Sequence, residues 1–144
     1  MSSMPVLTFV DTNVLLYAHD GRPGDDRCKL ARELVRQLWT AGAGVLSTQV
    51  LQEFYVNAVK TYKLAMAPAE ARRVVAAYGR WRIIPTDVEL ILSATRLSEE
   101  ESVSFWDALI IEAALRASAT WVVSEDMQDR RRFGTLTVRN PFAS

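Results

Sequence analysis

The sequence is poor in the side chains that build disulfides and zinc sites. Among its 144 residues are one cysteine, Cys28, and one histidine, His19. A single cysteine excludes a disulfide within the chain and a Cys-rich zinc site, so we interpret Cys28 as a small apolar residue. His19 has no second His or Cys with which to share a metal, and we expect it to have a surface or loop role.

The sequence also lacks an excess of charge and a long hydrophobic run. Its 17 Lys and Arg balance its 17 Asp and Glu, which gives a formal net charge of +0. A neutral chain has no strong overall field to attract nucleic acid, which argues against a simple polyanion-binding module but not against an enzyme with a local site. No apolar run reaches the roughly 18 residues that cross a membrane, and the N-terminus has no signal-peptide pattern. We therefore expect a cytoplasmic protein.

What is present is the composition of an ordinary globular domain. Hydrophobic residues make up 49% of the chain and charged residues 24%, and the length is that of one domain. No internal repeat, linker or low-complexity tract divides the sequence. We predict one domain that spans residues 1–144.

Short apolar strands alternate with helices along the whole chain. The predicted strands cover residues 6–10, 45–46, 83–84, 120–124 and, as a last edge strand, 136–138. The predicted helices cover residues 13–18, 26–40 after a cap at Asp25 or Asp26, 49–64, 68–78, 86–97 and 105–117. This alternation implies a mainly parallel central sheet flanked by helices on both faces, which is a three-layer α/β domain.

Capping residues mark the ends of some of these helices. Gly42 is placed to end the second helix. Thr86 and Glu89 have the spacing of a capping box, so we predict that the fifth helix begins there. The acidic residues 99–101 follow the predicted end of that helix and are interpreted as a solvated connection.

An acidic residue directly follows the first predicted strand. Residues 6–10 are apolar and largely β-branched or aromatic, which suits a strand buried on both faces. Asp11 comes where this strand ends, and open α/β sheets bind their ligands just beyond the carboxyl ends of their strands. The alternative is that Asp11 and Asn13 are ordinary turn or helix-cap residues, because their side chains accept hydrogen bonds from nearby amides.

Two further acids lie on helices beside apolar residues. Glu53 borders an apolar stripe, and taken alone it is interpreted as a boundary residue that reaches solvent. Asp107 shares an apolar helix face with Ile110 and Ile111. Its alternative role is electrostatic, since it lies three residues after Ser104, where a carboxylate interacts favourably with the helix dipole.

The fourth acid follows the predicted strand over residues 120–124. Asp126 lies two residues after Ser124, so Asp11 and Asp126 take equivalent places at the carboxyl ends of two buried strands. On its own, Asp126 would be an N-cap or turn residue. Glu125 and Asp129 lie in the same loop and could share or take over its role.

Taken together, the four acids indicate a metal site. Four carboxylates at strand ends and helix starts could converge on one edge of the sheet, where they would repel one another unless a cation lay among them. Oxygen ligands without His or Cys suit Mg²⁺ or Mn²⁺. Such an ion activates water and stabilises the leaving oxygen of a phosphodiester. The pattern therefore predicts metal-assisted phosphoryl hydrolysis.

Four segments, in this order, resemble the PIN-domain nucleases. They are Val-Asp-Thr-Asn-Val-Leu at residues 10–15, Glu53 on the third predicted helix, Phe-Trp-Asp-Ala-Leu-Ile at 105–110 and Ser-Glu-Asp-Met-Gln at 124–128. The length and the ending Asn-Pro-Phe at 140–142 resemble the VapC-type toxins of bacterial toxin–antitoxin pairs. The resemblance covers essentially the whole chain.

The resemblance implies a metal-dependent endoribonuclease. The family's acidic quartet, which holds Mg²⁺ or Mn²⁺, corresponds to Asp11, Glu53, Asp107 and Asp126. Asn13 corresponds to a polar residue that supports the first Asp, and Ser124 to a Ser or Thr that orients the site or helps to hold the metal-bound water. The toxin branch also implies a structured RNA substrate, a cognate antitoxin whose tail covers the site, and a homodimer.

The segment Asp-Arg-Arg-Arg at residues 129–132 departs from the relatives, which often carry a Gly- or His-containing stretch there. This departure leaves open whether Asp129 is an additional ligand. It also provides a basic strip, Arg130, Arg131 and Arg132, that we hypothesise contacts RNA phosphates. Other candidates for this contact are Arg72, Arg73, Arg80 and Arg82, although each alone is typical of a solvated surface charge.

Two other functions compete with this interpretation. A haloacid-dehalogenase-like phosphohydrolase would also use an Asp after the first strand, but it needs a second Asp where this chain has Asn13 and a catalytic Lys, and neither Lys60 nor Lys63 lies in an evident motif. Trapping an aspartyl-phosphate at Asp11 would identify it. The second alternative is a catalytically silent PIN-like scaffold that binds RNA, which the presence of all four acids disfavours.

Overall fold

The computed structural model describes residues 6–22, 24–60 and 64–143. Six strands and six helices occupy this part of the chain. The strands are β1 (Thr8–Val10), β2 (Gly44–Ser47), β3 (Arg82–Ile84), β4 (Trp121–Val123), β5 (Arg132–Phe133) and β6 (Leu136–Arg139). The helices are α1 (Thr12–His19), α2 (Asp26–Ala41), α3 (Thr48–Lys60), α4 (Pro68–Tyr78), α5 (Val88–Glu101) and α6 (Phe105–Arg116). The predicted third helix includes residues 61–63, which lie outside the described residues.

The strands form one sheet in the order β3-β2-β1-β4-β6-β5. The central strand β1 pairs in parallel with β2 on one side and with β4 on the other, and β6 runs parallel to β4. The mainly parallel sheet is therefore confirmed. The prediction that the last strand is an edge strand is wrong, because β5 pairs antiparallel with β6 and takes the edge. A strand of two residues is too short to produce a hydrophobic period that sequence reasoning could detect.

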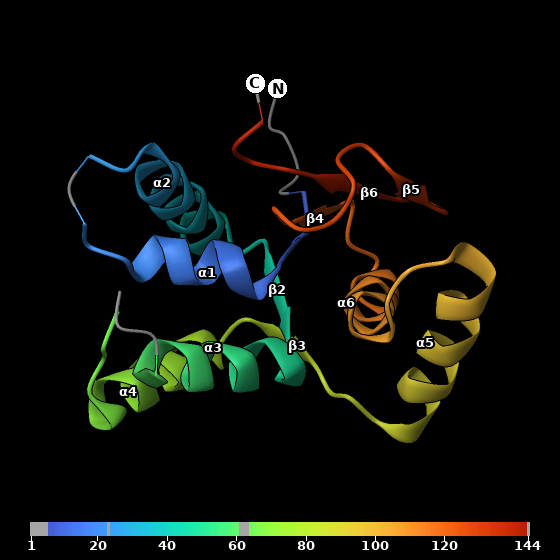
Figure 1. Ribbon diagram of the computed structural model, residues 1–144, viewed down its shortest axis with the longest axis horizontal. Helices are drawn as coiled ribbons and strands as arrows, with labels where there is room; N and C mark the ends of the chain where they lie inside the picture. Colours follow the sequence, from blue (N-terminus) through green and yellow to red (C-terminus); the bar gives the residue numbers. More distant parts are fainter. Residues whose placement is uncertain (1–5, 23, 61–63, 144) are drawn as a thin grey trace.

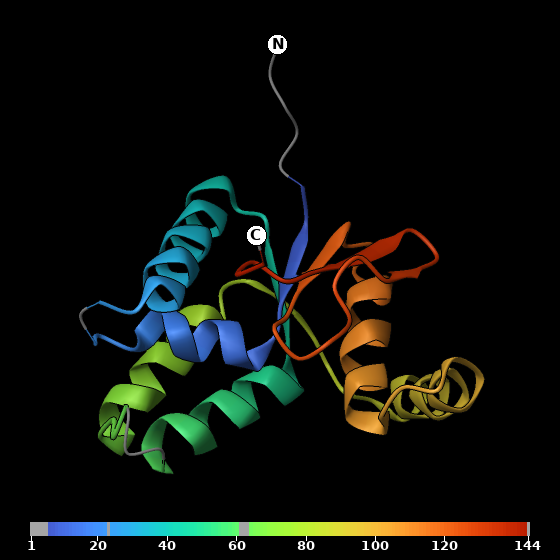
Figure 2. The same ribbon diagram turned by 45° about the horizontal axis from the view of Figure 1, so that its top comes forward.

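Helices cover both faces of this sheet. Figures 1 and 2 show α1 to α4 on one side and α5 and α6 on the other. The core between these layers is built largely from fully buried strand residues and from the inner face of α6, among them Phe9, Val10, Val45, Leu46, Val122 and Ile111. Cys28 is buried, as expected of a small apolar residue. The three-layer α/β fold class is confirmed, and no helix in the described part of the chain is long and apolar enough to cross a membrane.

The ends of α2 agree with the sequence. The side chain of Asp25 caps the helix by accepting a hydrogen bond from the Arg27 amide. Gly42 ends it in the left-handed conformation, with φ of 64°, where an L-residue with a side chain would be strained.

The helix α5 differs from the prediction at both ends. Its cap is Asp87, whose carboxylate accepts a hydrogen bond from the Leu90 amide at 2.8 Å. The predicted cap, Thr86, is engaged elsewhere, because its amide and its hydroxyl both contact the hydroxyl of Thr48. The helix continues to Glu101. The acidic residues 99–101, predicted as a connection, therefore form its last turn.

An aromatic cluster fills the space between the helices on the α1–α4 side. The His19 ring packs edge-on against Phe54 and Tyr78, and its Nε2 lies 2.8 Å from the Tyr78 hydroxyl. The surface or loop role predicted for His19 is wrong, since the residue is half-buried at the end of α1. The neighbouring Trp81 ring lies directly against Gly44, where a methyl group would overlap it.

Candidate active site

The central strand pair brings Asp11 and Ser124 together. Asp11 follows β1 and is 8% exposed. Its Oδ2 accepts a hydrogen bond from the Ser124 hydroxyl at 2.7 Å, and its Oδ1 accepts one from the Thr12 amide at 2.8 Å. The two residues meet because Val10 is paired with Val123 in the sheet. Asp11 therefore caps α1, as the alternative interpretation held, and is also a buried carboxylate at the carboxyl edge of the sheet.

Asp126 reaches the same edge through Asn13 and Ser124. The Asn13 side-chain amide donates to Asp126 Oδ2 at 2.8 Å, and the Asn13 Oδ1 accepts from the Glu125 amide at 3.4 Å. The Asp126 amide donates to the Ser124 hydroxyl oxygen at 3.2 Å. The Ser124 hydroxyl thus links the two acids at the ends of β1 and β4, while the Asp126 side chain stays open to solvent.

Glu53 is attached to the edge by neutral donors. The Thr12 hydroxyl donates to Glu53 Oε1 at 2.7 Å. The side-chain amide of Gln49, one turn earlier on α3, contacts Glu53 Oε2 at 3.4 Å and the carbonyl oxygen of Trp106 at 3.4 Å. Glu53 is half-buried, and its contacts connect α1, α3 and the start of α6.

Asp107 lies in the first turn of α6. Its amide donates to the hydroxyl of Ser104, the N-cap residue, at 3.0 Å. This position fits the predicted interaction with the helix dipole. The Asp107 carboxylate is also near enough to Asp126 and Glu53 for their charges to raise its pKa.

The four acids share one electrostatic environment. Burial is the main cause that raises the pKa of Asp11 from 3.8 to about 6; the charges of Asp107 and Glu53 add to it, and hydrogen bonds from Ser124 and the α1 backbone oppose it. Burial likewise raises the pKa of Asp107, with further contributions from Asp126 and Glu53. Charges of one sign that disfavour one another's ionisation are the setting in which a cation is stabilised.

The chemistry of these donors fits a divalent cation, but their present positions do not enclose one. Carboxylate, amide and hydroxyl oxygens without His or Cys suit Mg²⁺ or Mn²⁺. Within the described residues, however, no three Asp, Glu, His or Cys side chains are gathered closely enough to hold an ion. Asp11, Glu53 and Asp126 are each hydrogen-bonded to a neutral neighbour instead. Ion binding therefore requires side-chain movements that bring these carboxylates closer together.

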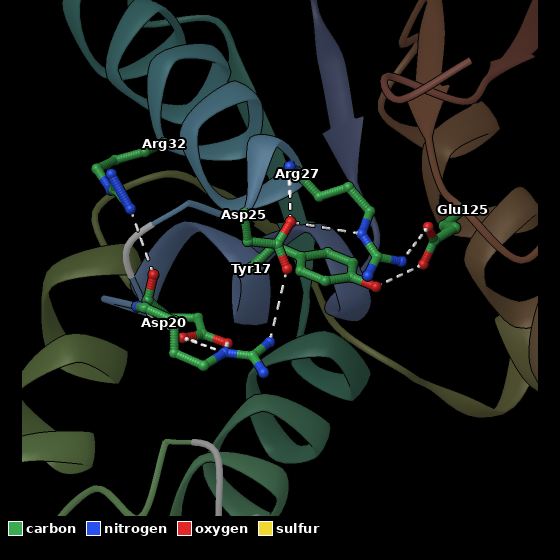
Figure 3. Close-up of polar contacts among 7 residues, drawn as sticks. Tyr17, Asp20, Asp25, Arg27, Arg32 and Glu125 are labelled. Carbon is green, nitrogen blue, oxygen red and sulfur yellow. Dashed lines mark hydrogen bonds and ion pairs between the residues drawn. The ribbon is translucent and has the colours of Figure 1, made fainter.

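The Glu125 carboxylate binds residues outside the acidic edge, the part of the sheet edge that carries Asp11, Glu53, Asp107 and Asp126. It accepts hydrogen bonds from the Tyr17 hydroxyl at 2.8 Å and from Arg27 Nη1 at 3.2 Å (Figure 3). Arg27 also pairs with Asp25 and lies over the Tyr17 ring, 4.9 Å from its centre. Glu125 thus does not share the position of Asp126. It ties the segment that carries Ser124 and Asp126 to α1 and to the start of α2.

Asp129 is also engaged elsewhere. Its Oδ1 accepts a hydrogen bond from the Asn140 amide at 2.8 Å. This contact fixes the segment after β6 rather than adding a carboxylate to the site.

The three arginines at residues 130–132 do not form one continuous strip. Arg130 is exposed and has a left-handed backbone, with φ of 70°. Arg131 donates from Nη2 to the carbonyl oxygen of Glu101 at 2.7 Å and lies over the ring of Phe133, 4.7 Å from its centre. Arg132 is exposed on β5. The side chains separate because the chain passes from a turn into a strand, and their contact with RNA stays a prediction.

Sequence reasoning named Ser124 and Asn13 as supporting residues, although the Asn13 amide contacts Asp126 and not Asp11 as the resemblance implied. It missed Thr12 and Gln49, the neutral residues that hold Glu53. Gln49 and Glu53 are four residues apart on a helix, a spacing at which polar side chains meet, so this pair could have been found. The bond from Thr12 to Glu53 could not, because it depends on how α1 packs against α3.

A parallel α/β sheet with four interacting acids at its carboxyl edge defines a class of domain in which ligands bind beyond the strand ends. The chain matches the family model of the PIN domain over residues 8–133. It therefore belongs to the PIN domain family. No protein among curated sequences matches it significantly.

Several solved structures have a similar fold. A toxin–antitoxin complex from Klebsiella pneumoniae is 18% identical, with a TM-score of 0.68, and the match covers 94% of this chain and 98% of that one. VapC20 of Mycobacterium tuberculosis, described as a toxin that cleaves the sarcin–ricin loop, is 22% identical, with a TM-score of 0.56 over 80% of this chain and 86% of that one. DNA-bound VapBC from Salmonella typhimurium is 18% identical, with a TM-score of 0.66 over 94% and 98% of the two chains.

Proposed function

We propose that this PIN domain, which we take to span residues 1–144, is a VapC-like toxin that cleaves RNA with Mg²⁺ or Mn²⁺ bound to its acidic edge. The observation that carries the proposal is the position of Asp11, a buried carboxylate at the carboxyl edge of the sheet, which Ser124 links to Asp126 and which lies near enough to Asp107 and Glu53 for their charges to raise its pKa. A buried Asp with a raised pKa destabilises the metal-free fold, so its presence is best explained by a cation that it binds.

Each residue of the acidic edge has a separate role in this proposal. Asp11, Glu53, Asp107 and Asp126 are the acids that would hold the ion, which supplies Lewis-acid chemistry for phosphodiester hydrolysis. Ser124 orients Asp11 and Asn13 orients Asp126, each through one short hydrogen bond. Thr12 keeps Glu53 turned toward the edge until a ligand replaces it. The Ser124 hydroxyl would also help to hold the water molecule that attacks the phosphate.

The proposal extends to the partners of the protein. The similar structures include toxin–antitoxin complexes, and we infer that a cognate antitoxin covers the acidic edge and silences the enzyme in the cytoplasm. We also infer a homodimer. An open apolar groove of about 360 Å³ between α3 and α4, lined by Leu51, Tyr55, Val56 and Val75, is available for such an interface.

RNA cleavage by the purified protein in Mg²⁺, Mn²⁺ or EDTA tests the proposal. Asp11→Asn and Asp107→Asn each remove one carboxylate charge with little change in shape, and we expect each to lower the rate at least about a hundredfold, as loss of charge stabilisation does in other enzymes. Asp129→Asn is the matched control, because that carboxylate holds the Asn140 amide and Asn can accept the same bond.

Two results would contradict the proposal. Cleavage that survives in both site variants would show that another group or a contaminant cuts the RNA. RNA binding without any metal-dependent cleavage would instead identify a silent scaffold.

A further inference from the structure

A separate cavity of about 210 Å³ opens beside the acidic edge. It lies between the start of α6, the loop after β4 and the β5–β6 hairpin. Its apolar surface comes from Ile111, Met127, Phe133 and Val138. Pockets for whole drug-sized ligands measure about 300–1,000 Å³, so this cavity has room for a single ring system.

The polar groups of the cavity carry opposite charges. Asp107 and Asp126 line it where it meets the acidic edge, and Arg131, the residue before β5, lines it with the opposite charge. Gln128, whose amide both donates and accepts, also lines it. A phosphate would be repelled by the two acids, and a simple cation by the arginine. The cavity therefore fits a neutral group with donors on one edge and acceptors on another.

Arg131 is held in place before any ligand binds. Its Nη2 donates to the carbonyl oxygen of Glu101 at 2.7 Å and contacts the Glu101 carboxylate at 3.4 Å, while its guanidinium lies over the Phe133 ring. Its amide donates to the Gln128 carbonyl at 3.3 Å, and its carbonyl accepts from the Val138 amide at 2.8 Å. The hydrogen bonds of this side chain to other described residues all use Nη2, so Nε and Nη1 remain available to a ligand.

The carboxylates also have capacity left. Asp126 accepts from Asn13 through Oδ2, and each carboxylate has two oxygens with about four sites for hydrogen bonds. An acid that contributes one oxygen to the acidic edge can therefore offer the other to the cavity.

We propose that this cavity binds one unpaired guanine base of the RNA, next to the phosphate that is cut. Guanine carries N–H donors on its N1 and N2 edge and acceptors at O6 and N7, and arginine to O6 and N7 is the commonest specific contact to a base. Only guanine presents two donors to the acids and two acceptors to Arg131 at once. Adenine, cytosine and uracil each carry a hydrogen-bond donor at one position only. RNA sequence is read mainly on unpaired bases.

The assignment of this cavity rests on the proposed function, because it specifies which base of the RNA substrate the nuclease would recognise. Binding of that base can nevertheless be tested without cleavage. Labelled uridine hexamers with one central guanosine, inosine, adenosine or cytidine are titrated in EDTA and followed by fluorescence anisotropy. We expect the guanosine hexamer to bind about 5- to 100-fold more tightly than the adenosine hexamer. Inosine, which lacks the N2 amino group, should fall between them.

Arg131→Leu keeps an apolar side chain on Phe133 and should abolish the preference for guanosine. Arg132→Leu is the matched control, because Arg132 is the adjacent exposed arginine and does not line the cavity. It removes the same charge and should weaken binding to all four hexamers equally. If Arg131→Leu does not fold, Arg131→Met keeps an unbranched apolar side chain of similar length on Phe133, removes every donor and should also lose the preference.

Equal affinity for all four hexamers, or a preference that Arg131→Leu retains, would overturn the assignment of the cavity. These results are distinct from a failure of the proposed function. A guanosine preference that depends on Arg131, in a protein that cuts no RNA with any metal, would support the cavity and refute the nuclease.

Discussion

The buried carboxylate of Asp11 should make the metal-free protein less stable at neutral pH than its Asp11→Asn variant. The pKa of Asp11 rises from 3.8 to about 6 in the fold, chiefly because of burial. Each pKa unit corresponds to about 1.4 kcal/mol, so the ionised side chain lowers the free energy of unfolding by about 3 kcal/mol above pH 6. Asn removes the charge and still caps α1 through the Thr12 amide. Its side-chain amide can donate to the Ser124 hydroxyl oxygen.

The sign of the pH dependence follows from the same pKa. Between pH 3.8 and about 6 the folded state holds a proton on Asp11 that the unfolded state has released, so stability falls as the pH rises through this window. Urea unfolding in EDTA, followed by tryptophan fluorescence, should therefore show Asp11→Asn more stable by up to about 3 kcal/mol at pH 7.5. The difference should narrow as the pH falls and approach zero below the unfolded pKa of 3.8.

A bound cation should stabilise the wild type more than the Asp11→Asn variant. Mn²⁺ should raise the melting temperature of the wild type, because it binds the folded state only, and should have less effect on Asp11→Asn. Equal stability of the two proteins at pH 7.5 in EDTA, or a difference that does not change with pH, would refute the reasoning.

Two further predictions concern the aromatic cluster. Gly44→Ala should lower the free energy of unfolding by about 1–3 kcal/mol or more, because its methyl group overlaps the Trp81 ring. The control is Gly21→Ala, whose methyl group meets nothing within 4 Å and which should leave the free energy of unfolding unchanged or raise it by up to about 1 kcal/mol. Equal losses in the two variants on urea unfolding would contradict this prediction. Burial lowers the pKa of His19 below 6.5, so the unfolded chain takes up the proton first and stability is lost as the pH falls below 6.5. The loss between pH 7.5 and pH 5 should be smaller in His19→Gln, and an identical loss in the two proteins would show that His19 is not the group responsible.

The fold was predictable because its signals are local. The strands around Phe9, Val45 and Val122 are short apolar runs, and the alternation with helices selects a parallel sheet. The edge strand β5 was not predictable, since two residues carry no period and its pairing depends on the turn at Gly134. Asp87 rather than Thr86 caps α5 because Thr86 finds a partner, Thr48, that is distant in the sequence.

The same distinction applies to the candidate site. Its acids could be named from the sequence because strand ends and helix starts of parallel sheets meet at one edge. The contact that holds Glu53 could not be named, since the bond from Thr12 to Glu53 depends on the packing of two helices. The position of Arg131 beside the cavity depends likewise on the left-handed backbone of Arg130. Such a turn is normally predicted from a glycine, and this position has none. Glu125 and Asp129 lie in the same loop as Asp126, and the sequence allowed either to join the four acids. In the structure their carboxylates instead bind Tyr17 and Arg27, and the Asn140 amide, respectively.

The pairing of β1 with β4 has a consequence for synthesis on the ribosome. The hydrogen bond from Ser124 to Asp11 and that from Asn13 to Asp126 each join residues that are 113 positions apart. A nascent chain therefore has Asp11 long before it has the groups that orient it, and the central strand has no β4 to pair with until late in translation. Contacts over such distances also form slowly. If the protein cuts RNA as proposed, its acidic edge can be assembled only after most of the chain has been synthesised, and a product truncated before β4 would lack Ser124 and Asp126.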